Sequence, residues 1–199
     1  MMKNTIGKIF FIIMLLTPLC VVAQDKVYKI GDYYNVNGVE GIVFYTTDNG
    51  RHGKIISMDS RGEGYYYWTT LHDSEFESFT TNASDEDDGQ RNTERIKGLD
   101  NYSPEAFPAF ACCIGKGPGW YLPAINEMRE IANARAQDDL DAAIANAGGV
   151  SLKSYYWSST ERLGSYSKSN AWAIILEQGT VFGFTKHGVT YHVRPVHKF

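Results

Sequence analysis

Two stretches of the chain carry aromatic side chains in or beside polar sequence, a combination that suits ligand binding more than bond-breaking chemistry. Residues 65–68 read Tyr-Tyr-Tyr-Trp, and residues 162–170 mix aromatic, basic and amide side chains. Aromatic rings offer rigid apolar faces, and polar groups beside them fix the orientation of a ligand such as a sugar. We therefore predict that the ligand-binding residues are Tyr66, Trp68, Tyr166, Lys168 and Asn170. The alternative for each residue is that its side chain is buried in the core or is simply solvated, without contacting a ligand.

The motifs of the common enzyme classes are absent from the sequence. The stretch Gly115–Gly119 is glycine-rich, but Lys116 is not followed by Ser or Thr and no glycine stands five residues before it, as a phosphate-binding loop requires. There is no His-Glu-x-x-His, no Cys-x-x-Cys and no Gly-x-Ser-x-Gly. No pair of carboxylates stands out as a glycosidase pair. We predict a non-catalytic protein.

Two groups of residues invite a test for metal binding, and neither matches a known pattern. The three C-terminal histidines are spaced by five residues, so neighbours on one strand would face opposite sides. If the acidic run 85–88 began a calcium loop at Asp85, Gly89 would fall at position 5 and Ile96 at position 12, which an EF-hand excludes. We predict no metal and no cofactor, with calcium held by irregular loops as an open alternative. Asp88 is expected to cap the following turn.

The N-terminal residues have the order of a secretory signal. Lys3 and Lys8 precede a short apolar run, 9–16, and Val21-Val22-Ala23 offers small residues for cleavage. We predict a signal peptide at 1–23 and one mature domain at 24–199, with no transmembrane segment after cleavage. The expected location is the periplasm, the outer surface or the medium. Lipidation at Cys20 is disfavoured because Leu19, which is not small, precedes it.

The net charge limits which partners the chain can attract, and the cysteine content limits which disulfides it can form. Removing residues 1–23 leaves 17 basic and 23 acidic residues, a net charge of −6. An acidic domain has no general attraction for nucleic acid, so we predict no such partner. The mature cysteines, Cys112 and Cys113, are adjacent and cannot build a disulfide framework. We expect both to be small buried apolar side chains, with a bond between them as the alternative.

Hydrophobic periodicity predicts an α+β chain in which strands come first, helices follow and strands end the sequence. Strands are expected within 27–58, with turns at Asn37-Gly38 and Asp48-Asn49-Gly50, and a long irregular stretch at 59–90. Helices are expected at 92–96, 105–113, 124–134 and 138–147, and further strands at 155–158, 171–176, 181–184 and 191–196. Both ends of the chain are expected to meet in one sheet.

Four segments in order resemble a known bacterial family. The segments are Asp88–Thr93, Gly119–Pro123 with Glu127, Tyr156–Glu161 leading to Ala171-Trp172, and Val193–Val196. They resemble the domain at the C-terminus of Legionella collagen-like (Lcl) adhesins, which also occurs in many exported proteins of unknown function. That family is similar to the formylglycine-generating, sulfatase-modifying fold, a variety of C-type-lectin-like fold. The resemblance covers about Gly31 to Lys198.

The resemblance implies a C-type-lectin-like fold with a twisted antiparallel sheet, two main helices and long loops. It also implies structural roles for eight residues: Trp120, Pro123, Glu127, Trp157, Ser158, Glu161, Trp172 and Arg194. The chain departs from the family at Ala124, where a Ser often caps the helix, and in lacking collagen-like repeats. The adjacent cysteines also do not match the separated pair of the sulfatase-modifying enzymes.

Taken together, these features predict an exported, adhesin-like binding module that recognises a glycan or a protein. The alternative is a structural or assembly component of a pilus or another cell-envelope complex. An exposed apolar patch or an unpaired sheet edge would favour that alternative, because both invite association with another chain.

Overall fold

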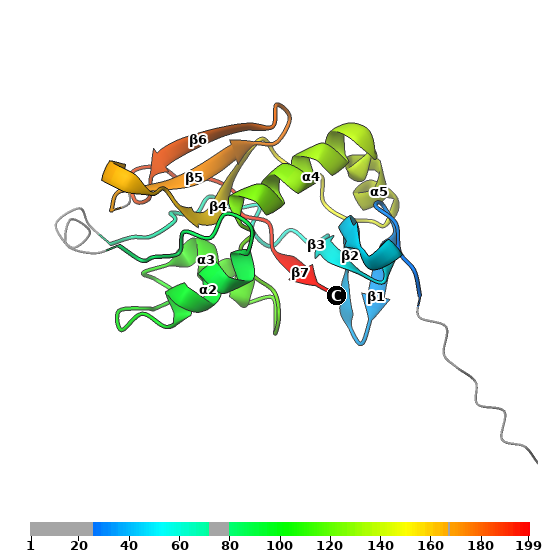
Figure 1. Cartoon of the computed structure of the whole chain (residues 1–199), viewed down its shortest axis with the longest axis horizontal. Helices are drawn as coiled ribbons and strands as arrows, with labels where there is room; N and C mark the ends of the chain where they lie inside the picture. The colour runs from blue at the N-terminus through cyan, green and yellow to red at the C-terminus, as the bar shows by residue number, and fades with distance from the viewer. Residues whose placement is uncertain (1–25, 72–79, 167) are drawn as a thin grey trace, which may run out of the picture.

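A computed structural model describes residues 26–71, 80–166 and 168–199 (Figure 1). The predicted signal peptide lies outside this part of the chain. Within it, four α-helices and two antiparallel sheets form a mixed α+β structure. The helices are α2 (Gly89–Lys97), α3 (Pro108–Ile114), α4 (Ile125–Gln137) and α5 (Leu140–Asn146). The strands are β1 (Tyr33–Val36), β2 (Val39–Thr47), β3 (His52–Ile56), β4 (Tyr155–Glu161), β5 (Asn170–Ile175), β6 (Thr180–Thr185) and β7 (Val196–Lys198), with short 3-10 turns η1 (Asp48–Gly50) and η2 (Gly164–Tyr166).

The first sheet has the strand order β1-β2-β3-β7. Its opening hairpin turns at Asn37 and Gly38, which have φ of 53° and 81°. Two positive φ values are what a tight primed hairpin turn requires, so the Asn-Gly prediction is confirmed. The last strand pairs with β3, and Val196 lies opposite Ile56. The first and last strands of the described chain therefore lie in one sheet, as predicted.

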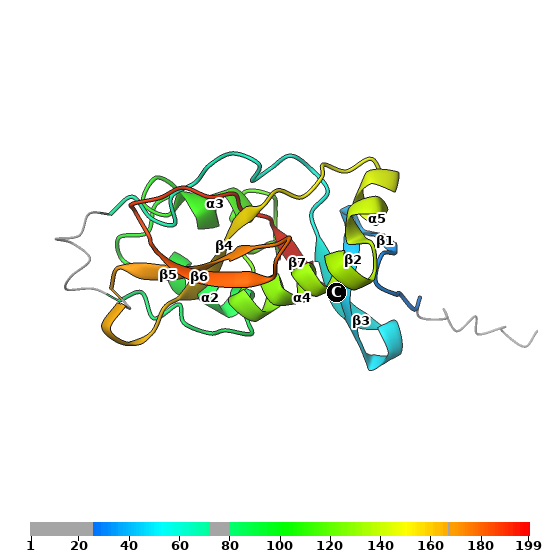
Figure 2. The same cartoon turned by 90° about the horizontal axis from the view of Figure 1, so that it is seen from above.

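The second sheet has the strand order β4-β5-β6. The single sheet that the resemblance implies is therefore wrong. The structure has the four helices that hydrophobic periodicity predicted, whereas the resemblance implied two main helices. Figures 1 and 2 both place α4 between the two sheets. Its 13 residues make it the longest helix of the described chain.

The predicted strand at 191–196 is replaced by a segment that crosses from one sheet to the other. Tyr191 makes an isolated bridge with Tyr66, and His192 makes one with Tyr156 of β4. Regular pairing begins only at Val196. Pro195 has no N–H to donate, and its carbonyl accepts a hydrogen bond from Ser57 at 2.9 Å. The crossing ties the two sheets together.

Two other predicted boundaries are wrong for local reasons. Residues 27–30 are not a strand, since Tyr28 makes a single bond to the Gly50 carbonyl and the chain turns at Gly31. The helix predicted from residue 105 begins at Pro108, because proline suits the first helical turn, where its missing N–H costs nothing.

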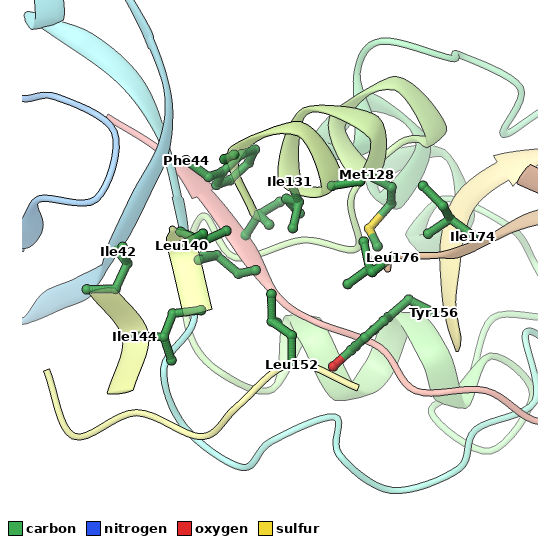
Figure 3. Close-up of a cluster of buried hydrophobic side chains, with 14 of the residues drawn as sticks. Ile42, Phe44, Met128, Ile131, Leu140, Ile144, Leu152, Tyr156, Ile174 and Leu176 are labelled. Atoms are coloured by element: carbon green, nitrogen blue, oxygen red, sulfur yellow. The ribbon is translucent and has the colours of Figure 1, made fainter. Parts of the chain in front are cut away.

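The main hydrophobic cluster gathers around α4 (Figure 3). Met128 and Ile131 of α4 point toward Tyr156 and Ile174 of the second sheet and toward Phe44 of β2. Leu140 and Ile144 of α5 close its other side (Figure 3). A second cluster lies on the opposite face of β4 and β5 and contains Trp68, Phe107, Phe110 and Trp157. The second sheet is thus packed on both faces along β4 and β5, which makes it a rigid support.

Candidate functional site

The five residues predicted to bind a ligand do not form one site. Trp68 has no exposed surface, and its ring centroid lies 4.9 Å from that of Phe110. Its indole N–H donates to the Ser158 carbonyl at 3.0 Å. The prediction of a ligand contact at Trp68 is therefore wrong, because the ring is a core residue whose polar atom is already paired.

Tyr66 is half-buried and lines a hollow of about 620 Å³. The other residues around the hollow are Asp59, Ser60, Arg61, Pro104, Pro108, Ala111 and Cys112. Burial, together with a hydrogen bond to Cys112, raises the pKa of Tyr66 to about 12. Burial also raises the pKa of the Cys112 thiol. A thiol held in its neutral form is a weak nucleophile, so the Cys112 thiol is not activated for covalent chemistry.

Of the three remaining predicted residues, Tyr166 and Lys168 lie in the connection between β4 and β5, and Asn170 begins β5. Tyr166 is 51% exposed, and the Arg162 guanidinium lies 4.3 Å from its ring centroid and 5.1 Å from that of Trp172. Lys168 is exposed, and Asn170 accepts a hydrogen bond from the Arg162 N–H at 2.9 Å. This loop is accessible, but its one large exposed ring is already stacked on a cation.

Several residues given structural roles by the resemblance belong to a buried network at the start of α4. The Glu127 carboxylate accepts from the Ala124 and Gly89 N–H groups at 2.8 and 3.1 Å and from the Tyr121 hydroxyl at 2.8 Å. Pro123 is buried, and its carbonyl accepts from the Ser159 N–H at 2.8 Å. Glu127 thus satisfies free N–H groups at the beginnings of both α2 and α4.

Glu161 and Lys186 form a second buried polar group, in which both side chains are almost completely excluded from solvent. The Glu161 carboxylate also accepts from the Thr81 and Asn82 N–H groups at 3.1 and 2.9 Å. Burial lowers the pKa of Lys186 to about 8, although the Glu161 carboxylate opposes that shift. The pair fixes the segment around Thr81 to the end of β4.

Arg194 anchors the third buried polar group and has no exposed surface. It donates to the Glu63 carboxylate at 2.6 Å and to the carbonyls of Asp59 and Val150 at 3.2 and 2.5 Å. Since Asp59 and Val150 belong to different loops, Arg194 holds both loops to the crossing segment.

The four other structural residues have partners inside the protein. Trp120 is 7% exposed and makes an edge contact with His197 at 5.4 Å. The Trp157 indole donates to the Tyr66 carbonyl at 2.9 Å, and the Ser158 hydroxyl donates to the carbonyl of half-buried Trp172 at 2.7 Å. All eight side chains therefore have packing or hydrogen-bonding partners within the described chain.

The acidic run uses its carboxylates to fold its own loop. Asp85 accepts from the N–H groups of Asp87 and Asp88 at 3.0 and 2.9 Å. Asp88 accepts from the Arg91 N–H at 3.1 Å, so the predicted cap is confirmed. Within the residues that the structure describes, no group of three or more His, Cys, Asp or Glu side chains is placed to hold a metal ion.

Cys112 and Cys113, the two cysteines in the described part of the chain, are both free, and they differ in exposure. Cys113 is fully buried in the cluster around Trp68, whereas Cys112 is half-buried and faces the hollow beside Tyr66. The expectation of two buried apolar side chains therefore fits Cys113 better than Cys112.

A row of partly exposed rings along the second sheet is a surface feature that the sequence did not predict. Phe182 and Phe184 of β6, Tyr191 of the crossing segment and Tyr155 of β4 follow one another, with centroid distances of 5.9, 5.0 and 5.5 Å. Tyr155 is 42% exposed and Phe182 is 39% exposed. We call these four side chains the aromatic row. Exposed apolar surface of this kind marks interaction sites.

The register of the second sheet explains why these rings lie together. Phe182 pairs with Ala173 of β5, and Ala173 pairs with Trp157 of β4. Paired residues project from the same face of an antiparallel sheet. Ala173 leaves room between the two large rings, and Tyr191 covers buried Trp157 at a centroid distance of 5.0 Å. The aromatic row therefore rests on a fixed base.

The hydroxyl groups at one end of the aromatic row give it polar character. Tyr155 and Tyr191 are stacked with an interplanar angle of 16°. Burial, and in second place the neighbouring Tyr155, raises the pKa of Tyr191. Its hydroxyl is therefore protonated at neutral pH and can both donate and accept a hydrogen bond. The aromatic row therefore has apolar rings, Phe182 and Phe184, at its β6 end and amphipathic rings, Tyr191 and Tyr155, at its β4 end.

The sequence contains one signal for the aromatic row. Phe182 and Phe184 stand two residues apart in a predicted strand, so they share a face. Periodicity cannot decide whether that face is the buried or the open one. Tyr155 and Tyr191 are 36 positions apart, and only the crossing segment brings them into contact.

Neither family models nor curated protein sequences match this chain when they are compared with it. The helices of the described residues include none with the length and apolar character needed to span a bilayer.

Proposed function

We propose that this chain is an exported, non-catalytic, adhesin-like module that binds a carbohydrate through the aromatic row. The observation that carries this proposal is the continuous series of rings from Phe182 to Tyr155, two of which are about 40% exposed. Rings on a rigid sheet lose little conformational entropy when a ligand binds. The resemblance to the Lcl C-terminal domain and its C-type-lectin-like fold supports a surface role, and the N-terminal signal supports export.

Carbohydrate is the ligand that this mixture of groups fits best. A sugar ring has apolar C–H faces and polar edges, so it needs flat apolar surface together with hydrogen-bonding groups. The rings of Phe182 and Phe184 supply the first, and the hydroxyls of Tyr155 and Tyr191 supply the second. The mature net charge of −6 favours neutral or basic sugars over acidic ones.

The test is binding of the mature chain, Gln24–Phe199, to a broad glycan array, with calcium and again with a chelator. Tyr155→Ala and Phe182→Ala should each remove most of the signal while leaving the unfolding midpoint nearly unchanged, because both rings are on the surface. Tyr166→Ala is the matched control, since Tyr166 is an exposed ring on a separate loop. A blank array in both conditions, or a signal lost only with Tyr166→Ala, would refute the proposed site.

A role in assembly is the second candidate, and the open edge of β6 favours it. Within the described residues β6 pairs only with β5, so one side of its backbone has no strand partner. Recovery of a specific envelope protein with the wild-type chain, together with a blank glycan array, would support assembly over carbohydrate binding.

A further inference from the structure

The edge strand β6 lacks the features that usually protect such a strand from pairing. It lies at the outer side of the second sheet (Figure 1), and its sequence is Thr-Val-Phe-Gly-Phe-Thr. Natural edge strands are commonly shielded by charged side chains, by proline or by bulges. This strand contains no charged residue and no proline, and its register with β5 is continuous over six residues. It therefore presents a regular, uncharged pairing edge.

Hydrogen bonds at the ends of β5 show which backbone groups of β6 face outward. The Lys186 backbone N–H donates to the Ser169 carbonyl at 2.8 Å. This pair comes directly after Asn170–Thr185, the end pair of the β5–β6 register. Hydrogen-bonded and non-hydrogen-bonded pairs alternate along an antiparallel ladder. Counting back from Lys186 in steps of two, Phe184 and Phe182 are also in hydrogen-bonded pairs, so their N–H and C=O groups point toward β5. The residues with groups directed to the open edge are Val181 and Gly183.

We propose that β6 pairs in antiparallel register with β6 of a second copy of this chain, centred on Gly183. The segment Phe182-Gly183-Phe184 has the same sequence in both directions. A two-fold axis at Gly183 places Phe182 opposite Phe184 of the second copy, and Val181 opposite Thr185. Aromatic and β-branched pairs of this kind stabilise sheets, and the strand itself contains no charged residue. An identical strand is thus a complementary partner at every position.

The pairing joins two three-stranded sheets into one continuous sheet. Directly opposed residues share a face, so the aromatic rows of both copies lie on the same side. Glycine at the axis has no side chain of its own, and the Arg162 side chain of each copy packs over it on the face opposite the aromatic row. If the aromatic row binds carbohydrate, the dimer is bivalent and gains avidity without new contacts. That last consequence depends on the proposed function, whereas the pairing itself does not.

The first experiment is sedimentation equilibrium of the mature chain over a wide range of concentrations. The wild-type chain should dimerise. Val181→Pro removes an outward N–H from each copy while keeping the bonds to β5. The dissociation constant of the dimer should therefore rise about 30-fold. Val181→Ala is the matched control, since it loses the same side chain but keeps the N–H and should remain dimeric. A wild-type chain that is monomeric at every concentration would overturn the proposal, as would an unaffected Val181→Pro variant.

A cross-linking experiment tests the register without relying on the proline variant. Antiparallel partners lie about 4.5–5.5 Å apart at Cα, which is within the range of a disulfide. Chains carrying Phe182→Cys should cross-link rapidly to chains carrying Phe184→Cys when the two are mixed and oxidised. Each variant alone should cross-link far more slowly, which also controls for the native cysteines. Equal rates in the mixture and in the separate samples would exclude pairing about Gly183, whatever the outcome of glycan binding.

Discussion

The buried pair Glu161–Lys186 should contribute strongly to stability when one partner is removed. The exposed fractions of the two side chains are 1% and 0%. Glu161→Gln keeps the shape of the side chain but leaves the Lys186 ammonium buried without its carboxylate. It also turns an amide N–H₂ toward the Thr81 or the Asn82 N–H, each of which now donates to an oxygen. We expect a loss of about 3–5 kcal/mol in the free energy of unfolding, the usual cost of breaking a buried pair from one side.

The assay is urea unfolding followed by tryptophan fluorescence, because the Lys186 ammonium lies 4.8 Å from the centroid of the Trp68 ring. In a thermal scan the same loss corresponds to a fall of about 6–20 °C for a domain of this size. Asp88→Asn makes the same chemical change in the Asp88–Lys198 pair, whose side chains are 40% and 39% exposed. Asparagine caps a helix as well as aspartate does, so this control should lose only about 0–1 kcal/mol.

A double variant separates the cost of an unpaired charge from the cost of altered packing. Glu161→Gln combined with Lys186→Met removes both charges and should recover most of the stability lost in Glu161→Gln, since a buried ion pair is often replaceable by apolar groups. The reasoning is refuted if Glu161→Gln loses no more stability than the Asp88→Asn control.

Three further predictions follow from the helix cap, the acidic groups and the thiols. Ala124→Ser supplies the side-chain oxygen that the N-cap of α4 lacks and should raise stability by roughly 0.5–1 kcal/mol, visible as a higher urea midpoint; an unchanged midpoint would contradict it. Burial alone would raise the pKa of Asp88, but Lys198 holds it below its usual value. The contribution of the Asp88 carboxylate to the free energy of unfolding is therefore complete above the pKa that this group has in the unfolded chain, and it is lost as the pH falls through the lower pKa of the folded chain. Asp88→Asn should flatten the acid limb of the curve of stability against pH. Burial raises the pKa of Cys113 well above its usual value, so a thiol reagent at mildly alkaline pH should modify it only on unfolding, and rapid labelling of the folded chain would count against its burial.

Local patterns predicted the features that depend on a few neighbouring residues. The Asn37-Gly38 turn, the Asp88 cap and the helix around Met128 are all present, because turn chemistry, capping and a helical apolar stripe are properties of short segments. The strands of β2 and β5 were predicted for the same reason.

Other features depend on where a segment lies in the folded chain, and these the patterns did not predict. The stretch 191–196 has the composition of a strand, but it serves as a crossing between two sheets. Trp68 follows three tyrosines in the sequence, two of them exposed, yet it packs against Phe110 in the core. In both cases long-range packing overrides local preference.

By itself, then, the sequence determined that the chain is α+β, where most helices and turns occur and that its ends meet in one sheet. Only the tertiary structure decided that there are two sheets, which face of β6 is open and that Tyr155 and Tyr191 stack on each other. The physical reason is that periodicity defines the two faces of a strand without saying what covers each one. Coverage depends on contacts between residues far apart in the chain, and those contacts created the aromatic row.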